Sequence, residues 1–327
     1  MAVYFAPMEG VTGFVCRNAY EACFKGTIDK YFAPFITARI MKAVTTKDLR
    51  DILPERNEGL YLVPQLLANR ADAFIQTAQA VTSLGYREIN LNLGCPSKTV
   101  VTKKKGAGFL ADPYQLDLFL DAVFSWCEKE KVDLSIKTRL GMYDEEEFEQ
   151  LLAVYNKYPL CELIIHPRTQ SDYYSGKPHY EAFFRAAAAS KNPVCYNGDL
   201  IDRSGIEKLH EANPEVDRIM IGRGFLMHPG FCTAESNAGR PGESSRGESN
   251  AEYDSNMLWA FHDCVYEGYC RYVSGERSIL FKMKELWTYF EKAFRQSDVS
   301  LQKALRQIRK SNTLTEYEIA VRVLKNL

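Results

Sequence analysis

Short runs of apolar, β-prone residues recur along the first 224 residues of the chain, and a stretch with helical periodicity follows most of them. The runs are apolar at nearly every position, which is typical of parallel strands buried on both faces. Most intervals between runs are about thirty residues, the length of one strand–helix unit. The pattern predicts eight strands, over Val3–Met8, Tyr31–Thr37, Tyr61–Leu67, Glu88–Gly94, Leu134–Leu140, Leu163–Arg168, Val194–Asp199 and Arg218–Gly224.

The stretches between these runs read as helices, for example Arg70–Leu84, Tyr114–Lys129 and Glu145–Tyr158. Eight strand–helix units in about 230 residues fit an α/β fold of the (β/α)8 TIM-barrel type. A doubly wound parallel sheet is the alternative, although it more often has about five or six strands. The glycine-rich GxGxxG fingerprint of dinucleotide-binding sheets does not follow the first strand, which argues against that alternative.

The strand–helix pattern stops after Pro229, and residues 235–250 are polar and rich in glycine and serine. Such a segment cannot pack a core and reads as a flexible linker. From Asp254 onward apolar residues return at helical spacing. The sequence therefore predicts a TIM-barrel catalytic domain over 1–230, a flexible linker or loop over 231–253 and a small all-helical domain over 254–327.

Charge is unevenly distributed in this chain of 327 residues, whose net charge is only −1. Residues 271–310 hold ten basic and four acidic residues, which leaves +6 on this segment. A basic helical surface of this kind is either a solvated face or a surface that follows an acidic partner such as an RNA backbone. Arg277, Lys282 and Lys284 are the first candidates for such contacts.

The cysteine pattern and the apolar runs bear on localisation. Nine cysteines are scattered, and none forms a CxxC pair, so we expect neither a disulfide framework nor a zinc site, and a reducing cytoplasm. No apolar run reaches the ~18 residues of a membrane span, and the first residues lack the features of a signal peptide. We expect a cytoplasmic monomer with no metal and no membrane partner.

Polar, reactive and glycine residues collect at the carboxyl end of nearly every predicted strand, which is the catalytic face of a TIM barrel. The loops after strands seven and eight often hold a phosphate in this fold. Here Gly198, Gly222 and Gly224 would let backbone N–H groups approach an anion, and Arg223 adds a charge that can bind it in bidentate fashion. These loops therefore predict a phosphate site.

Six motifs follow one another along the predicted barrel: Ala6–Thr12 (APMEGVT), Leu91–Lys98 (LNLGCPSK), Lys137–Gly141 (KTRLG), His166–Thr169 (HPRT), Asn197–Asp199 (NGD) and Gly222–Gly224 (GRG). In this order the chain resembles the tRNA-dihydrouridine synthases, and its helical end is similar in kind to that family's tRNA-binding domain. The resemblance implies an FMN enzyme, re-reduced by NADPH, that reduces the C5–C6 bond of specific uridines in tRNA.

The resemblance also implies a role for individual residues. Cys95 would be the catalytic acid. The residues that would bind FMN are Pro7, Met8 and Glu9 along the flavin, Gln65 and Lys137 at its ring, His166 beside it, and Asn197, Gly198, Asp199, Gly222 and Arg223 at its phosphate. The residues expected to contact tRNA are Asn92, Arg139, Arg168 and Tyr174 at the barrel, with Arg277, Lys282 and Lys284 on the helices.

The chemistry of the reaction agrees with two of these roles. Reduction of the C5–C6 bond needs a hydride at C6 and a proton at C5, and a free thiol, with a pKa of about 8.5, is mostly protonated at neutral pH. Cys95, after the glycine that ends the fourth strand, suits the proton donor. Lys137 lies in a core strand, where an ammonium is costly to bury unless it stabilises negative charge, such as that of a reduced flavin.

Two other functions are open on the sequence alone. An FMN TIM-barrel dehydrogenase acting on a free pyrimidine, like dihydroorotate dehydrogenase, would do similar chemistry, but it would need no basic helical domain. A non-catalytic RNA-binding protein on a barrel would bind no flavin. The sequence does not indicate which uridine is reduced.

Overall fold

The computed structural model describes residues 1–39, 44–233, 255–294 and 298–327. The chain divides into two compact units. The barrel unit comprises Met1–Pro7, Asp29–Asp199 and Glu207–Ile221, and the helical unit comprises Met8–Ile28, Leu200–Ile206 and Gly222–Leu327. Among the helices of the described residues, none is long and apolar enough to cross a membrane.

All strand segments lie in the barrel unit and form one parallel sheet in the order β3-β5-β6-β7-β8-β9-β10-β1-β2-β4. Leu62–Val63 (β4) and Gln65–Leu67 (β5) are one predicted strand, interrupted at Pro64 because proline has no N–H for the ladder. Since β4 pairs with β2 and β5 with β6, the sheet closes on itself. The other strands are β1 (Ala2–Phe5), β2 (Lys30–Phe32), β3 (Ile36–Thr37), β6 (Glu88–Leu93), β7 (Asp133–Arg139), β8 (Glu162–His166), β9 (Val194–Tyr196) and β10 (Arg218–Ile221).

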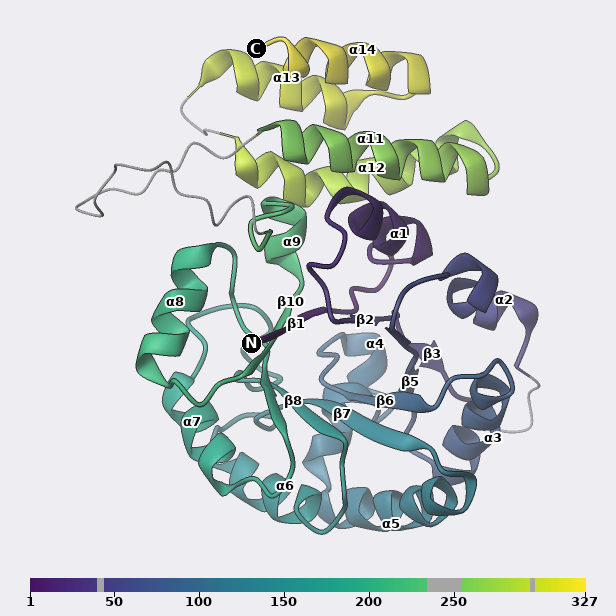
Figure 1. Cartoon of the computed structure of the whole chain (residues 1–327), viewed down its shortest axis with the longest axis vertical. Helices are drawn as coiled ribbons and strands as arrows, with labels where there is room; N and C mark the ends of the chain where they lie inside the picture. Colours follow the sequence, from purple (N-terminus) through teal and green to yellow (C-terminus); the bar gives the residue numbers. More distant parts are fainter. Residues whose placement is uncertain (40–43, 234–254, 295–297) are drawn as a thin grey trace. The chain divides into compact units, whose positions relative to one another are not determined.

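The predicted TIM-barrel fold is confirmed, because each of the eight predicted runs contains one strand or two consecutive strand segments. Helices α3, α5, α6 and α7 lie outside these strands (Figure 1). Helix α5 shows why the sequence forms them: the Asp112 side chain caps its start, Pro113 occupies the first turn, and it ends at Lys131 in a left-handed conformation. The helices that follow the strands are α2 (Thr46–Leu49), α3 (Ala71–Thr82), α4 (Lys98–Val101), α5 (Pro113–Glu130), α6 (Glu147–Tyr155), α7 (Tyr180–Ala189) and α8 (Arg203–Ala212).

The barrel interior is filled by side chains from alternate strand positions. Its apolar cluster consists of Tyr4, Ala6, Phe32, Val63, Ile164, Cys195 and Met220. The Cα register pairs Ile164 with Lys137 and Lys137 with Asn92. Side chains at paired positions of neighbouring parallel strands face the same side of a sheet, so Lys137 and Asn92 also project into the barrel.

The helical unit consists of α1 (Phe14–Cys23), α9 (Arg223–Met227), α11 (Ser255–Tyr272), α12 (Glu276–Phe290), α13 (Val299–Lys310) and α14 (Leu314–Lys325). The ring of Tyr20 in α1 lies 5.1 Å from that of Phe225 and 5.5 Å from that of Phe261, between centroids. Helix α1 and residues 222–230 thus share a core with the C-terminal helices, which differs from the domain boundary expected at residue 230. The predicted linker over 231–253 lies mostly outside the described residues.

Candidate active site

A chain of hydrogen bonds between buried polar side chains crosses β5, β6 and β7 inside the barrel. Asn92 Nδ2 donates to Gln65 Oε1 at 2.8 Å, and Gln65 Nε2 donates to Asn90 Oδ1 at 2.8 Å. Asn90 Nδ2 in turn donates to Ser135 Oγ at 2.9 Å. Because buried amides are costly unless they are paired, this chain fixes the orientation of each side chain.

The same chain of contacts fixes the peptide of Cys95. Asn92 Oδ1 accepts hydrogen bonds from the N–H groups of Gly94 (3.1 Å) and Cys95 (3.0 Å). Arg139 Nε donates to the Gly94 carbonyl at 2.9 Å, and the Ala107 N–H donates to the Cys95 carbonyl at 3.1 Å. The partly exposed thiol therefore sits on a rigid loop. Asn92 and Arg139, predicted to contact tRNA, act here on the loop that carries Cys95.

Gly106 closes this loop in a conformation that disfavours other residues, with φ +54°. A Cβ there would lie 2.9 Å from the Cys95 carbonyl oxygen, whereas a Cβ at Gly59 (φ +78°) would meet nothing within 4 Å. We therefore expect Gly59→Ala to cost about 1–2 kcal/mol of unfolding free energy and Gly106→Ala about 1–3 kcal/mol more. Urea unfolding of the two variants, both in the barrel unit, measures the difference. If both variants lost the same unfolding free energy, the close contact between a Cβ at residue 106 and the loop would have no effect on stability.

Lys137 is a lysine inside the barrel without a hydrogen-bond or ion-pair partner among the residues that the structure describes. Burial, and then the neighbouring Arg139, lower the pKa of its amine from 10.5 to about 8, and negative charge at Cys195 or Cys95 acts in the opposite direction. Lys137 and Cys95 thus influence one another electrostatically. An ammonium in this position fits an anionic group of a ligand.

Burial leaves other cysteines unreactive by comparison. It raises the pKa of the Cys127 and Cys232 thiols to about 12, and the pKa of Cys195 inside the barrel rises well above its ordinary value. These thiols are poor nucleophiles and pack as small core residues.

Arg168, His166 and Tyr174 gather at the ends of β7 and β8. The fully buried Arg168 forms an ion pair with Asp199 at 2.5 Å and contacts His166 Nε2 at 3.1 Å. The ring of Tyr174 is more than half exposed and lies near two side chains: its centroid is 5.3 Å from the Arg139 guanidinium and 6.2 Å from the centroid of the His166 ring. Arg168 thus contacts protein groups, while Tyr174 presents a ring to solvent.

The predicted phosphate-binding residues fall in both units. In the barrel unit, Asn197 Nδ2 donates to the Met220 carbonyl at 2.7 Å, and a Cβ on Gly198 would lie 2.6 Å from the hydroxyl of Tyr196. Packing alone therefore requires a glycine at 198. Pro7 ends the first barrel segment, while the helical unit holds Met8 and Glu9, in the turn before α1, and Gly222 and Arg223, at the start of α9.

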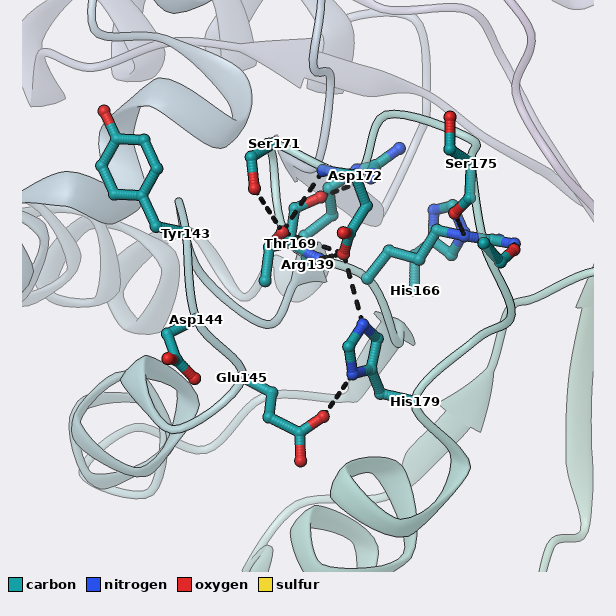
Figure 2. A network of polar contacts seen from close by, with 12 residues as sticks. Arg139, Tyr143, Asp144, Glu145, His166, Thr169, Ser171, Asp172, Ser175 and His179 are labelled. Atoms are coloured by element: carbon teal, nitrogen blue, oxygen red, sulfur yellow. Dashed lines mark hydrogen bonds and ion pairs between the residues drawn. The ribbon is translucent and has the colours of Figure 1, made fainter.

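A further polar network, which the sequence analysis missed, links the loops that follow β7 and β8 (Figure 2). His179 lies between two carboxylates: its Nδ1 contacts Glu145, and its Nε2 is 3.3 Å from Asp172. Asp172 also accepts hydrogen bonds from the N–H (2.7 Å) and hydroxyl (2.9 Å) groups of Thr169. No local motif signals a contact between residues so far apart in the chain.

Two of the basic residues predicted to bind tRNA have partners within the helical unit. Lys282 Nζ donates to the Gly10 carbonyl at 2.5 Å and pairs with Glu285 at 3.4 Å. Lys284 Nζ donates to the Ser311 carbonyl at the end of α13. Only Arg277 of the three predicted residues is exposed. Folding of the helical unit therefore engages part of the charge on α12.

Helix α13 carries a separate group of cations. Lys303, Arg306 and Lys310 lie at spacings of three and four residues, so they share one face of the helix. All three are exposed, and within the described parts of the chain none has a hydrogen-bond or ion-pair partner. We call these three residues the α13 basic face. The sequence shows these charges but not that they remain unpaired.

Comparisons with known proteins identify the family and support the fold. The family model described as "Dihydrouridine synthase (Dus)" matches residues 4–321. The chain is 29% identical over 230 residues to the probable tRNA-dihydrouridine synthase 2 of Bacillus subtilis (strain 168), covering 68% of this chain and 69% of that protein. It is 28% identical over 231 residues to a probable tRNA-dihydrouridine synthase of Staphylococcus epidermidis, covering 68% of each. Histamine dehydrogenase from Rhizobium sp. 4-9 shares the fold, with a TM-score of 0.56, 11% identity, and coverage of 73% of this chain and 46% of that one.

Proposed function

Because the chain belongs to the dihydrouridine synthase family, we propose that it reduces the C5–C6 bond of specific uridines in tRNA, as a flavin-dependent oxidoreductase. The observation that carries this proposal is that the backbone of Cys95 is held by Asn92 and Arg139, next to a strand whose Lys137 amine has no partner among the described residues. The direct test is nucleoside analysis of a tRNA treated with the protein, FMN and NADPH, in which we expect dihydrouridine to appear.

The residues of the barrel fit FMN. The Lys137 ammonium has no counter-charge among the described residues, so it can stabilise negative charge on a bound ring, and two hydrogen bonds fix the orientation of the Gln65 amide. FMN, when bound, supplies the hydride for C6 and is re-reduced by NADPH. The assignments of Pro7, Met8 and Glu9, and of Gly222 and Arg223 as phosphate ligands, rest on the resemblance of the motifs.

Cys95 is proposed to supply the proton for C5. Asn92 and Arg139 hold both sides of its peptide, so the backbone that carries the thiol keeps one position, which helps to place a general acid. Chemistry on a base in folded RNA also requires that the base leave its stack. The exposed ring of Tyr174, packed between Arg139 and His166, offers a surface on which a displaced base can stack.

We propose that the α13 basic face contributes phosphate contacts to tRNA. Cations that follow an RNA backbone release counterions on binding, and each lost contact flattens the plot of log affinity against log salt by about 0.7–0.9. Changing Lys303, Arg306 and Lys310 to glutamate should therefore weaken tRNA binding and reduce that slope by about 2–3. Titrations of tRNA at three salt concentrations measure both effects.

The matched control reverses three exposed lysines elsewhere, Lys47, Lys129 and Lys208, which gives the same change in net charge. This control should lose much less affinity, because only a general repulsion is added. Lys282→Gln and Lys284→Gln form a second comparison, since both side chains already bond to backbone carbonyls. Equal effects of the α13 and control reversals would place the tRNA contacts elsewhere.

A further inference from the structure

The chemistry of Asp199 does not suit a phosphate ligand. An ionised carboxylate has only hydrogen-bond acceptors, whereas a phosphate is held by donors and cations. In the structure both carboxylate oxygens face Arg168: Nη1 donates to Oδ1 at 3.0 Å and Nη2 donates to Oδ2 at 2.5 Å. This bidentate pair identifies the guanidinium as the group that Asp199 serves.

All five N–H groups of Arg168 have an acceptor, and the side chain is fully buried. Besides the two bonds to Asp199, Nε donates to the Ser175 carbonyl at 3.1 Å and Nη2 donates to the Gly176 carbonyl at 2.5 Å. The remaining N–H of Nη1 faces His166 Nε2 at 3.1 Å. Because the guanidinium is planar and rigid, these contacts together fix its position.

This contact determines where the proton of His166 resides. A guanidinium keeps its protons in a protein, so Nη1 donates and Nε2 accepts. The neutral ring must then carry its single proton on Nδ1. The ring is itself buried, and Tyr174 packs beside it at 6.2 Å between centroids. His166 therefore carries its one N–H group on Nδ1, in a fixed orientation at the carboxyl end of β8.

We propose that Asp199 and Arg168 are positioning residues: Asp199 orients the guanidinium, and the guanidinium holds His166 in the Nδ1–H tautomer. The inference goes beyond the proposed function, and it needs neither flavin nor tRNA. We assign this role to the Asp199 carboxylate. The tautomer itself is a property of the protein alone.

The test is a two-bond 1H–15N spectrum of the full chain labelled at its histidine rings, without RNA or NADPH, at pH 7.5. Its five histidines give separable ring signals, and those of His166 are the ones lost in His166→Gln. We expect Nδ1 protonated and Nε2 unprotonated at His166. In Asp199→Asn the ratio of the Nδ1–H to the Nε2–H form should fall about tenfold or more, because the guanidinium loses its charged acceptor.

Two variants separate this role from general packing. Asp172→Asn, in the neighbouring network, should shift the signals of His179 and leave the tautomer of His166 unchanged. Asp199→Glu keeps a carboxylate and should retain more of the Nδ1–H form than Asp199→Asn. An Nε2–H or doubly protonated His166 in the unmodified chain, or an unchanged ratio in Asp199→Asn, would overturn the proposal. Absence of dihydrouridine activity would leave these spectra as they are, so the two proposals fail separately.

Discussion

Replacing Cys95 with alanine should slow dihydrouridine formation about 10²–10⁴-fold, the range that a positioned general acid contributes. Reduction of the bound flavin by NADPH should be unchanged, because that step does not need the thiol. Asn92 and Arg139 bond to the backbone around residue 95, so the loop should keep its path when the side chain is shortened. Single-turnover assays that follow flavin oxidation by tRNA, next to stopped-flow reduction by NADPH, measure the two steps separately.

The control is Cys270→Ala, which removes an exposed thiol from α11 in the helical unit. It should leave both steps unchanged. A Cys95→Ala enzyme that reduces tRNA within a few-fold of the normal rate would remove the thiol from the mechanism, whatever the flavin does.

Replacing Lys137 with methionine should lower the midpoint potential of bound FMN by about 60–85 mV. One positioned donor stabilises a developing anion by ~2.7–4 kcal/mol. For a two-electron couple, about 30 mV corresponds to 1.4 kcal/mol, which converts this free energy into the stated range of potentials. Methionine keeps the apolar length of the side chain inside the barrel and removes only the amine. Spectroelectrochemical titration at pH 7 gives the potential directly.

The pH dependence provides a second signature of Lys137. With a pKa of about 8, the amine is charged below that pH and loses its proton above it. An anionic ligand binds the protein in which the Lys137 amine is charged. Above pH 8 the amine must therefore take up a proton when the ligand binds, so the affinity for the ligand falls as pH rises. This loss should be absent in Lys137→Met and present in Lys129→Met, an exposed control on α5. If the midpoint potential of bound FMN were the same in the unmodified protein, in Lys137→Met and in Lys129→Met, Lys137 would not belong to the flavin site.

The fold was predictable because its signal is local and repeated. Each strand is a short apolar run, and the eight runs appear at regular intervals, so errors at single boundaries did not change the count. The interruption at Pro64 splits one strand without altering the topology. The assignment of α1 to the helical unit was not predictable, because an apolar helix face does not reveal which core covers it; here Tyr20 packs with Phe225 and Phe261.

In the candidate site, too, some features could be predicted from the sequence and others could not. Cys95 and Lys137 could be proposed from the sequence because their positions in and after core strands conflict with simple packing. The contacts of Arg139 with Gly94 and of Arg168 with Asp199 join residues far apart in the chain, so only the folded structure shows that both side chains act on neighbouring protein groups. On the helices, the sequence reports where charges are but not which ones pair. The three residues that it indicated lie on α12, and the structure shows that two of them, Lys282 and Lys284, bond to backbone carbonyls.

The most direct test of the account is nucleoside analysis of a tRNA pool that lacks dihydrouridine, after incubation with the flavin-loaded protein and NADPH. We expect dihydrouridine at defined positions, formed in proportion to the NADPH consumed, with little or none from Cys95→Ala and no reduction of free uridine or orotate. If the flavin-loaded protein consumes NADPH, yet no tRNA in the pool gains dihydrouridine, the proposed function is contradicted.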